Sequence, residues 1–386
     1  MTNRFYQFRH GLEQLSQQGL YRTRRVIDGP QSVVINVNGK QVVNFSSNDY
    51  LGLANHPEVV AVFKKALDQY GVGSGSAHLI CGHSHAHHAL EEELAEFTGR
   101  ERALLFSTGY MANVGVISAL VGRGEYVLED RLNHASLLDG GLLSRAQFSR
   151  FKHADYADLQ AQLLNNAGRK LVVSDGVFSM DGDLADLPLL AGLVEQYQAG
   201  LLIDDAHGFG VLGKTGGGIA EHFGLTQNQV PILMGTLGKA FGTFGAFVAG
   251  SEALIEWLIQ KARSYVFTTA LPAAVAEATR TSLRLLQAES WRREHLQALI
   301  ARFRLGAAQQ GLQLMDSFTP IQPIVVGDSQ QVMAISSALL ARGFLLSPIR
   351  PPTVPKGTAR LRITFSAEHQ FHQVDALLDV LGKVIP

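Results

Sequence analysis

The chain has 386 residues, of which 46% are hydrophobic and 17% are charged, so we expect a globular protein with more than one lobe. Its 33 Lys and Arg residues against 34 Asp and Glu residues give a net charge of -1, which argues against nucleic acid as a partner. The only cysteine, Cys81, excludes an intramolecular disulfide. Because the sequence has neither a signal-peptide pattern nor an apolar run of about 18 residues, we expect a cytoplasmic protein without a membrane span.

The first elements of the chain are predicted to be a helix and a hairpin. Apolar residues at helical spacing predict an amphipathic helix that ends near residue 19; they are Phe5, Phe8, Leu12 and Leu15. Two β-rich runs then flank Asn38-Gly39, the dipeptide that best tolerates positive φ in a type I′ turn. From about residue 57, apolar strands alternate with helices. This alternation is typical of an α/β fold with a mostly parallel sheet covered by helices on both faces.

The C-terminal part is predicted to form a smaller unit. A helical stretch from about Ala274 to Gln310, with a break, leads out of the α/β region, and the strands and helices after it indicate an α+β arrangement. We therefore expect an N-terminal helix and hairpin in 1–46, a large domain in 47–283 and a small domain in 284–386.

One glycine-rich segment resembles two nucleotide-binding motifs. GFGVLGKT, at 208–215, fits both G-x-G-x-x-G and G-x-x-x-x-G-K-[ST]. Both motifs need a helix to begin inside them, because its free N–H groups hold the phosphates. Here Gly216, Gly217 and Gly218 follow at once, and each disfavours a helix by about 1 kcal/mol. We interpret the segment as a turn after a strand.

A second cluster suggests metal binding on composition alone. It comprises four histidines close to Cys81, namely His83, His85, His87 and His88. His83 and His87 could share one face of a helix. Nothing nearby completes a closed ligand shell, so we favour a solvated or structural cluster and expect no metal.

Three strand ends carry groups that suit one cofactor. Lys239 lies among glycines and apolar residues, where desolvation frees an amine to form a Schiff base. Asp204 and His207 end an apolar strand, and such an aspartate could hold a pyridine nitrogen protonated. Gly109 and Tyr110 open a helix whose N–H groups could receive a phosphate. Together these groups predict pyridoxal 5'-phosphate as the cofactor.

Nearly the whole chain resembles the α-oxoamine synthase family of class II pyridoxal-phosphate transferases. The segments that carry the resemblance are SNDYLGL, HASLLDG, GVFSMDGDLADL, DDAHGFGVLG, TLGKAFGTFGA, FTTALP and IRPPTVPKGTARLRIT. The resemblance implies a fold type I transferase that acts as a homodimer. It implies the decarboxylative condensation of an amino acid with an acyl thioester. A catalytically silent member of the fold would be expected to lack Lys239, which is present.

The resemblance also implies a role for each matching residue. The catalytic residues would be Lys239, His134, Asp204 and His207. The cofactor would be held by Gly109, Tyr110, Ser179, Asp204, His207, Thr236 and Lys239, with Thr268 and Thr269 reaching in from the second subunit. The substrates would be bound by Arg22, Asn48, His134, Thr353 and Arg362. Arg350, in the same turn as Thr353, receives no role.

The amino-acid substrate is indicated by one small residue. Ala77 stands where the glycine-using members of the family carry threonine, and the space that it leaves favours L-alanine. The resemblance implies a pimeloyl thioester as the acyl donor. The effect is modest, because one methylene changes discrimination by only about 1 to 3 kcal/mol. Glycine with an acetyl thioester is the alternative, and the carrier of the acyl group, coenzyme A or acyl carrier protein, stays open. The segment around Lys239 departs from the commoner pattern at Ala246, which affects packing more than chemistry.

Overall fold

The computed structural model describes residues 8–385, so Phe5 of the predicted first helix lies outside the described residues. The chain divides into two compact units. The large unit comprises 49–179 and 183–295, and the small unit comprises the residues up to 48, 180–182 and the residues from 296 onward. The N-terminal segment thus belongs to the same unit as the C-terminal segment. The predicted boundary after residue 283 falls inside helix α11 (Ala273–Ala288), which lies wholly in the large unit.

The large unit is built on a seven-stranded sheet in which only one strand, β10, runs antiparallel to its neighbours. The mostly parallel sheet expected from the alternating pattern is confirmed. Its strands, in spatial order, are β4 (Arg102–Phe106), β10 (Ala246–Gly250), β9 (Ile232–Thr236), β8 (Gly200–Asp204), β7 (Lys170–Asp175), β5 (Tyr126–Asp130) and β6 (Gln147–Phe151). The central strands are mostly apolar and almost wholly buried, with aspartates at the ends of β7 and β8, which is why they read as short hydrophobic runs.

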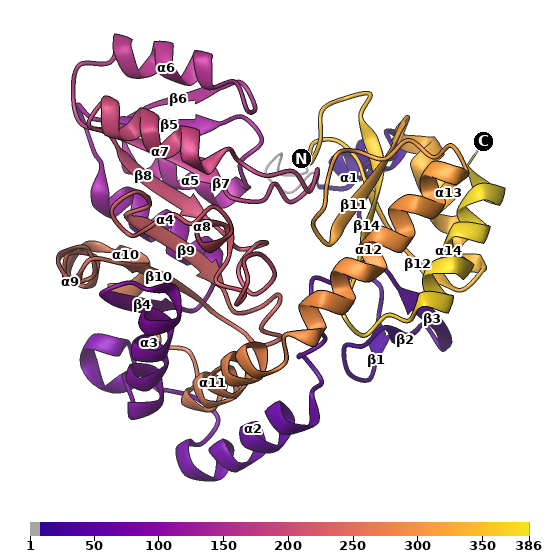
Figure 1. Cartoon of the computed structure of the whole chain (residues 1–386), viewed down its shortest axis with the longest axis horizontal. Coiled ribbons are helices and arrows are strands. Elements are labelled where there is room, and N and C mark those ends of the chain that lie inside the picture. The colour runs from indigo at the N-terminus through magenta and orange to yellow at the C-terminus, as the bar shows by residue number, and fades with distance from the viewer. Residues whose placement is uncertain (1–7, 386) are drawn as a thin grey trace, which may run out of the picture. The chain divides into compact units, whose positions relative to one another are not determined.

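Helices pack around this sheet (Figure 1). Those that contact one another beside β4, β9 and β10 are α4 (Gly109–Leu120), α5 (Ala135–Ser144), α9 (Glu252–Lys261) and α10 (Arg263–Val266). A second pair in contact is α6 (Tyr156–Asn165) and α7 (Leu187–Gln196), and α8 (Ile219–His222) is a single short turn. Helix α11 packs on α2 (Pro57–Tyr70) and α3 (His85–Thr98), and a short π-helix, η2 (His78–Gly82), precedes α3.

Strand direction decides where the functional residues gather. Strands β4, β5, β7, β8 and β9 all point the same way, so the segments after them emerge at one edge of the sheet. Those segments carry Gly109, His134, Ser179, His207 and Lys239. Residues that are far apart in the sequence are therefore brought together by the sheet alone.

The small unit contains two small sheets and four helices among the described residues. Its strands are β1 (Ile27–Asp28), β2 (Val34–Val37), β3 (Lys40–Asn44) and β12 (Phe344–Leu345) in one sheet, and β11 (Ile321–Gly327), β14 (Ala359–Thr364) and β13 (Ser347–Ile349) in the other. Its helices are α1 (Phe8–Gln17), α12 (Trp291–Gln309, from Leu296 onward), α13 (Ser329–Ala341) and α14 (Phe371–Val384). The hairpin at Asn38-Gly39 is confirmed, with φ of 51° and 81°.

Candidate functional site

A cavity of about 190 Å³ lies in the large unit, at the edge of the sheet where the parallel strands end. Eight of its lining residues were predicted from the sequence to belong to the site: Gly109, Tyr110, His134, Ser179, Asp204, His207, Thr236 and Lys239. Five others complete the lining, namely Asn113, Ser136, Asp175, Ala206 and Met234. The strand ends thus form one site rather than several.

The amine of Lys239 is hydrogen-bonded to a histidine, which is in turn hydrogen-bonded to a tyrosine. Lys239 Nζ lies 2.8 Å from His207 Nε2, and His207 Nδ1 lies 2.6 Å from the hydroxyl of Tyr50. Tyr50 is fully buried, so its ring fixes one side of the imidazole. Because a neutral imidazole has one donor and one acceptor nitrogen, His207 can accept a hydrogen bond from the amine while it donates to Tyr50. The three side chains therefore form a hydrogen-bonded chain from Lys239 through His207 to Tyr50.

Asp204 is buried and oriented by two hydrogen bonds. Asn113 Nδ2 donates to its Oδ2 at 2.7 Å, and the backbone N–H of Ala206 donates to its Oδ1 at 2.9 Å. The two bonds fix the orientation of the carboxyl group at the edge of the cavity. Asn113 lines the same cavity, and its Oδ1 is a buried acceptor with no protein partner among the described residues. The site thus offers acceptors for a ligand that carries a donor.

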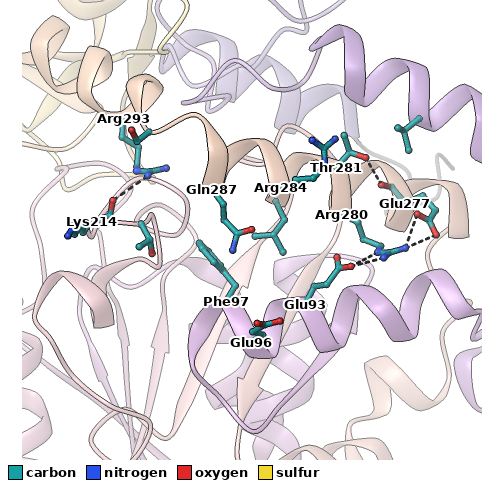
Figure 2. Close-up of a pocket in the computed structure, with 14 residues that line it drawn as sticks. Glu93, Glu96, Phe97, Lys214, Glu277, Arg280, Thr281, Arg284, Gln287 and Arg293 are labelled. Carbon is teal, nitrogen blue, oxygen red and sulfur yellow. Dashed lines mark hydrogen bonds and ion pairs between the residues drawn. The ribbon is translucent and has the colours of Figure 1, made fainter.

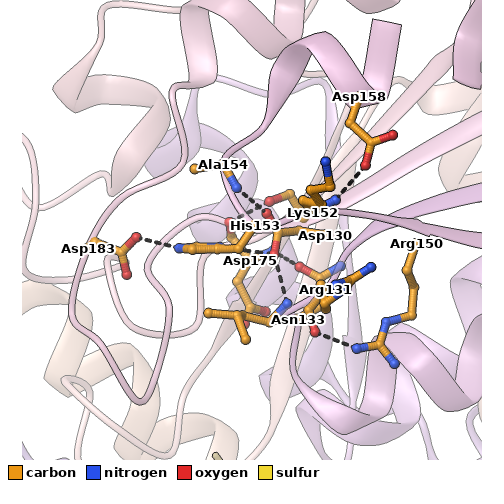
Figure 3. Close-up of polar contacts among 12 residues, drawn as sticks. Asp130, Arg131, Asn133, Arg150, Lys152, His153, Ala154, Asp158, Asp175 and Asp183 are labelled. Carbon is orange, nitrogen blue, oxygen red and sulfur yellow. Dashed lines mark hydrogen bonds and ion pairs between the residues drawn. The ribbon is translucent and has the colours of Figure 1, made fainter. Parts of the chain in front are cut away.

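His134 is held in one tautomer beside Asp204. Its Nδ1 accepts from the backbone N–H of Ser136 at 3.3 Å, which leaves the proton on Nε2. Burial lowers the pKa of His134, and the nearby Asp204 opposes this only in part. The backbone N–H of His134 donates to Asp175 Oδ2 at 3.0 Å, and Figure 3 shows Asp175 next to Asn133 of the same turn. Burial and the charge of Asp204 raise the pKa of Asp175.

The remaining end of the cavity is the start of α4. Thr108 caps this helix, because its Oγ1 accepts from the N–H of Met111 at 3.2 Å. Strand β4 ends at Phe106, two residues before this cap. Helix geometry leaves the N–H groups of Gly109 and Tyr110 without backbone acceptors, and they meet the positive end of the helix dipole. An anionic group is favoured there.

The other predicted residues lie elsewhere. Thr268 and Thr269 belong to the large unit, where residue 269 pairs with Ala77 in an isolated bridge, and neither lines the cavity. The predicted substrate residues Arg22, Asn48, Thr353 and Arg362 belong to the small unit. Within it, both terminal nitrogens of Arg362 lie 3.2 Å from Asn48 Oδ1. Arg22 and Thr353 are exposed, and Arg350 Nη2 donates to the carbonyl of Tyr21 at 2.8 Å.

Sequence reasoning gave no role to Tyr50, Asn113 and Asp175. Tyr50 lies in the quoted segment SNDYLGL, but only the fold brings it to His207, which is 157 positions away. Asn113 sits one turn inside α4 and reads as a helix residue. Asp175 did carry a signal, since it ends an apolar strand just as Asp204 does.

A larger cavity, of about 1030 Å³, lies along α11 and α3 (Figure 2). Two of its arginines are engaged by other groups of the protein: Arg280 by two glutamates and Arg293 by a backbone carbonyl. Arg280 Nη2 lies 2.6 Å from Glu93 Oε1, Arg280 Nη1 lies 3.0 Å from Glu277 Oε2, and Arg293 donates to the carbonyl of Leu286 at 2.7 Å. We interpret this cavity as a surface groove lined by charged side chains. It contains none of the predicted site residues.

The loop at 208–218 is a chain of turns, as predicted, and the next helix begins only at Ile219. Its N–H groups are already bonded to carboxylates: those of Thr215 and Gly217 donate to Glu221 at 2.9 and 2.7 Å, and that of Ile219 donates to Asp205 at 2.7 Å. These backbone N–H groups, which a phosphate would need, are thus already hydrogen-bonded within the protein.

The histidine cluster is arranged differently from the prediction. His83 and His87 do not share a helix face, because α3 begins at His85. Three ligand atoms, one each from His78, His83 and His87, lie within 4.8 Å of one another. His87, however, uses both nitrogens: Nδ1 accepts from the N–H of Ser84 at 3.0 Å and Nε2 lies 2.7 Å from the carbonyl of Leu271. The ring acts as a helix cap, which supports a structural role.

Comparison with known proteins identifies the family. The model of the family described as aminotransferase class I and II matches residues 40–381. The chain belongs to the class I and II aminotransferase family. Within that family, the 8-amino-7-oxononanoate synthase of Thioalkalivibrio sulfidiphilus is 63% identical over 374 residues, which are 96% of this chain and 95% of the relative. That of Pseudomonas aeruginosa is 62% identical and covers 95% of this chain and 91% of the relative.

Solved structures of the family share the fold. The serine palmitoyltransferase of Sphingomonas wittichii is 34% identical with a TM-score of 0.93, covering 100% of this chain and 98% of that one. A high-resolution SPT structure with a PLP internal aldimine is 33% identical, with a TM-score of 0.93 over 99% of this chain and 97% of that one. The 8-amino-7-oxononanoate synthase of Francisella tularensis is 32% identical, with a TM-score of 0.79 over 89% and 97%. The fold type I architecture is confirmed.

In residues 8–385, no helix is both long enough and apolar enough to cross a membrane.

Proposed function

We propose that this chain is a pyridoxal-phosphate enzyme that condenses L-alanine with a pimeloyl thioester, releasing carbon dioxide and the free thiol carrier. The product is 8-amino-7-oxononanoate, an intermediate of biotin biosynthesis. The observation that carries the proposal is the juxtaposition of Lys239, His207 and Asp204 in one cavity, in a chain 61–63% identical to proteins named for this reaction. We expect the reaction to take place in the cytoplasm.

The residues of the cavity fit the cofactor. Asp204 would hold the pyridine nitrogen, since its carboxylate is buried and already oriented by Asn113. The N–H groups of Gly109 and Tyr110, together with Thr236, would hold the phosphate. Three further side chains would contact the ring and its phenolic oxygen; they are His134, Ser179 and His207. The cavity thus has a carboxylate for the ring nitrogen, an amine for the covalent link and a helix start for the phosphate.

Lys239 would act twice in the reaction. It would form the covalent link to the cofactor, and its freed amine would then remove the Cα proton of alanine. When bound, pyridoxal phosphate supplies the electron sink that makes this proton removable. His207, 2.8 Å away, would orient the amine. After the new carbon–carbon bond forms and carbon dioxide leaves, Lys239 would return a proton to the same carbon.

His134 would assist at the acyl group. Because its Nδ1 accepts from Ser136, its Nε2–H is a donor for the thioester carbonyl. Because its pKa is lowered, the His134 ring stays neutral and donates this hydrogen bond as an uncharged imidazole. This donor would stabilise the negative charge that develops on the carbonyl oxygen when the carbon–carbon bond forms.

The small unit would supply the substrate contacts. Arg362 and Asn48 are already adjacent, and a guanidinium with an amide beside it suits a carboxylate. Arg22 and Thr353 would face the acyl substrate. We further propose a homodimer, in which Thr268 and Thr269 of one copy would complete the phosphate site of the other. Both threonines lie outside the cavity of their own chain, which is compatible with this role.

The cofactor can be tested by reduction. Borohydride added to the purified protein loaded with pyridoxal phosphate should leave a pyridoxyl group on Lys239, located by peptide mass spectrometry. Lys239→Ala should show no adduct, and Lys214→Ala, in the motif-like loop, should show the same adduct as the parent. A parent without the adduct would remove the basis of the proposal.

The substrates can be tested in parallel. Carbon dioxide and thiol release should be fastest with L-alanine and a pimeloyl thioester, compared with glycine and with acetyl or succinyl thioesters. If glycine with the acetyl thioester is faster, the chain is a 2-amino-3-oxobutyrate CoA ligase, or glycine C-acetyltransferase. Pimeloyl groups carried on coenzyme A and on acyl carrier protein should be compared in the same assay, since no residue discriminates between them.

A further inference from the structure

One histidine outside the cavity is bound on both sides by carboxylates (Figure 3). His153 Nδ1 lies 3.0 Å from Asp130 Oδ1, and His153 Nε2 lies 2.9 Å from Asp183 Oδ2. Ionised carboxylates only accept hydrogen bonds, so both ring nitrogens must donate, and the ring is an imidazolium. Burial lowers the pKa of His153, but the hydrogen bonds and charges of the two aspartates outweigh it and raise the pKa to about 9.

The first aspartate fixes the turn that leads to His134. Asp130 is the buried last residue of β5, and its Oδ1 also accepts from the N–H of Leu132 at 2.8 Å. Its backbone carbonyl accepts from the N–H of Asn133 at 3.2 Å. The next residue, His134, lines the cavity. Asp130 therefore sets the path of the whole turn, and His153 neutralises its charge.

The second aspartate fixes the loop that carries Ser179. The backbone carbonyl of Asp183 accepts from the N–H of Phe178 at 3.0 Å, so the two residues face each other across the base of the loop. The ring of Phe178 meets His153 edge-on, with centroids 4.4 Å apart. Asp183 Oδ1 is buried without a hydrogen-bond partner among the described residues, so His153 is the side chain that compensates this carboxylate.

We propose that His153 is a positioning residue for the reaction: its imidazolium joins the turn that carries His134 to the loop that carries Ser179. The inference rests on the proposed function, because both of those residues are assigned to the cofactor. His153 itself does not line the cavity. It acts through two carboxylates that approach opposite ring nitrogens from different loops, and a neutral imidazole, which has a single N–H, can donate to only one of them.

The test uses the enzyme loaded with pyridoxal phosphate. His153→Gln should lower kcat by about 10-fold or more, because small misplacements of groups around a reacting centre cost one to two orders of magnitude. The visible circular dichroism of the bound cofactor should weaken, since it reports how rigidly the ring is surrounded. KM for alanine should change less than kcat. His85→Gln, an exposed histidine of the same unit, is the matched control and should leave all three unchanged.

A second variant separates positioning from stability. His153→Gln leaves the carboxylates of both Asp130 and Asp183 uncompensated, so the variant should also melt at a lower temperature. His153→Gln with Asp183→Asn removes one of these two charges and should recover part of the melting temperature. The double variant also lacks the imidazolium that joins the His134 turn to the Ser179 loop. Its kcat and the visible circular dichroism of its cofactor should therefore stay low.

The outcomes are distinct. If either folded variant has a kcat per bound cofactor and a dichroic band close to those of the parent, His153 is only a structural residue and the inference is wrong. Borohydride reduction of each variant provides the separate control. A parent that forms no adduct at Lys239 would instead overturn the proposed function, whatever the His153 variants do.

Discussion

The turn that carries Lys239 depends on one glycine. Gly242 has a φ of +65°, and its N–H closes the turn by donating to the carbonyl of Lys239 at 2.9 Å. A Cβ at this position would lie 2.3 Å from the backbone nitrogen of Ala54 and 2.5 Å from the carbonyl carbon of Leu53. Gly242→Ala would therefore destabilise the protein in two ways. A residue with a side chain in the left-handed region costs about 1 to 2 kcal/mol of stability. Overpacking of the new Cβ against the backbone of Leu53 and Ala54 costs about 1 to 3 kcal/mol more.

The expected loss is about 2 to 5 kcal/mol, which should lower the melting temperature by at least about 4 °C in a unit of this size. Because the turn must move to relieve the overlap, Lys239 should also be displaced, and kcat should fall by about 10- to 100-fold. Thermal unfolding of the cofactor-loaded protein, with steady-state kinetics on the same sample, measures both effects.

The matched control is Gly192→Ala. Gly192 lies in α7 and does not have a positive φ, and a Cβ at this position would meet no other atom within 4 Å. Alanine there should be neutral or stabilising by up to about 1 kcal/mol. If Gly242→Ala melts like the parent and retains its kcat, the steric argument is wrong and the turn has room that the contacts do not indicate.

Three further predictions concern buried charges. Asp204→Asn should retain the cofactor but lower kcat by about 100-fold or more, as expected when one member of a buried charge pair is removed; an unchanged kcat would contradict the role of the carboxylate. The pKa of His153 is raised from 6.5 to about 9, so its stabilisation is complete below pH 6.5 and is lost as the pH rises through 9. The melting-temperature difference between the parent and His153→Gln should shrink across that window, and a constant difference would count against the imidazolium. Burial raises the pKa of Glu91 to about 8, although the N–H of Leu105 donates to it, so its ionisation opposes folding increasingly from about pH 4.5 to 8. Glu91→Gln should therefore gain melting temperature relative to the parent as the pH rises through this range, and a gain independent of pH would refute the assignment.

Strand-end chemistry was the part of the site that the sequence could predict. Lys239, Asp204 and His207 each follow an apolar strand, and parallel strands bring their carboxyl ends to one edge, so local signals were enough. Tyr50 could not be found in this way, because its role depends on a contact across 157 positions. Asn113 was hidden for a different reason, since nothing in a helix pattern says which polar side chain points toward a strand end.

The three aspartates that end neighbouring strands illustrate what sequence patterns leave open. Asp130, Asp175 and Asp204 end β5, β7 and β8, which are adjacent in the sheet, so the fold places three carboxyl groups in a row. Three buried negative charges in a row would repel one another. The structure resolves this differently at each position. His153 compensates Asp130, burial and the neighbouring charge favour the protonated form of Asp175, and Asp204 is held by hydrogen bonds from Asn113 and Ala206. In the proposed function, the carboxyl group of Asp204 is the one that would face a cationic ring nitrogen.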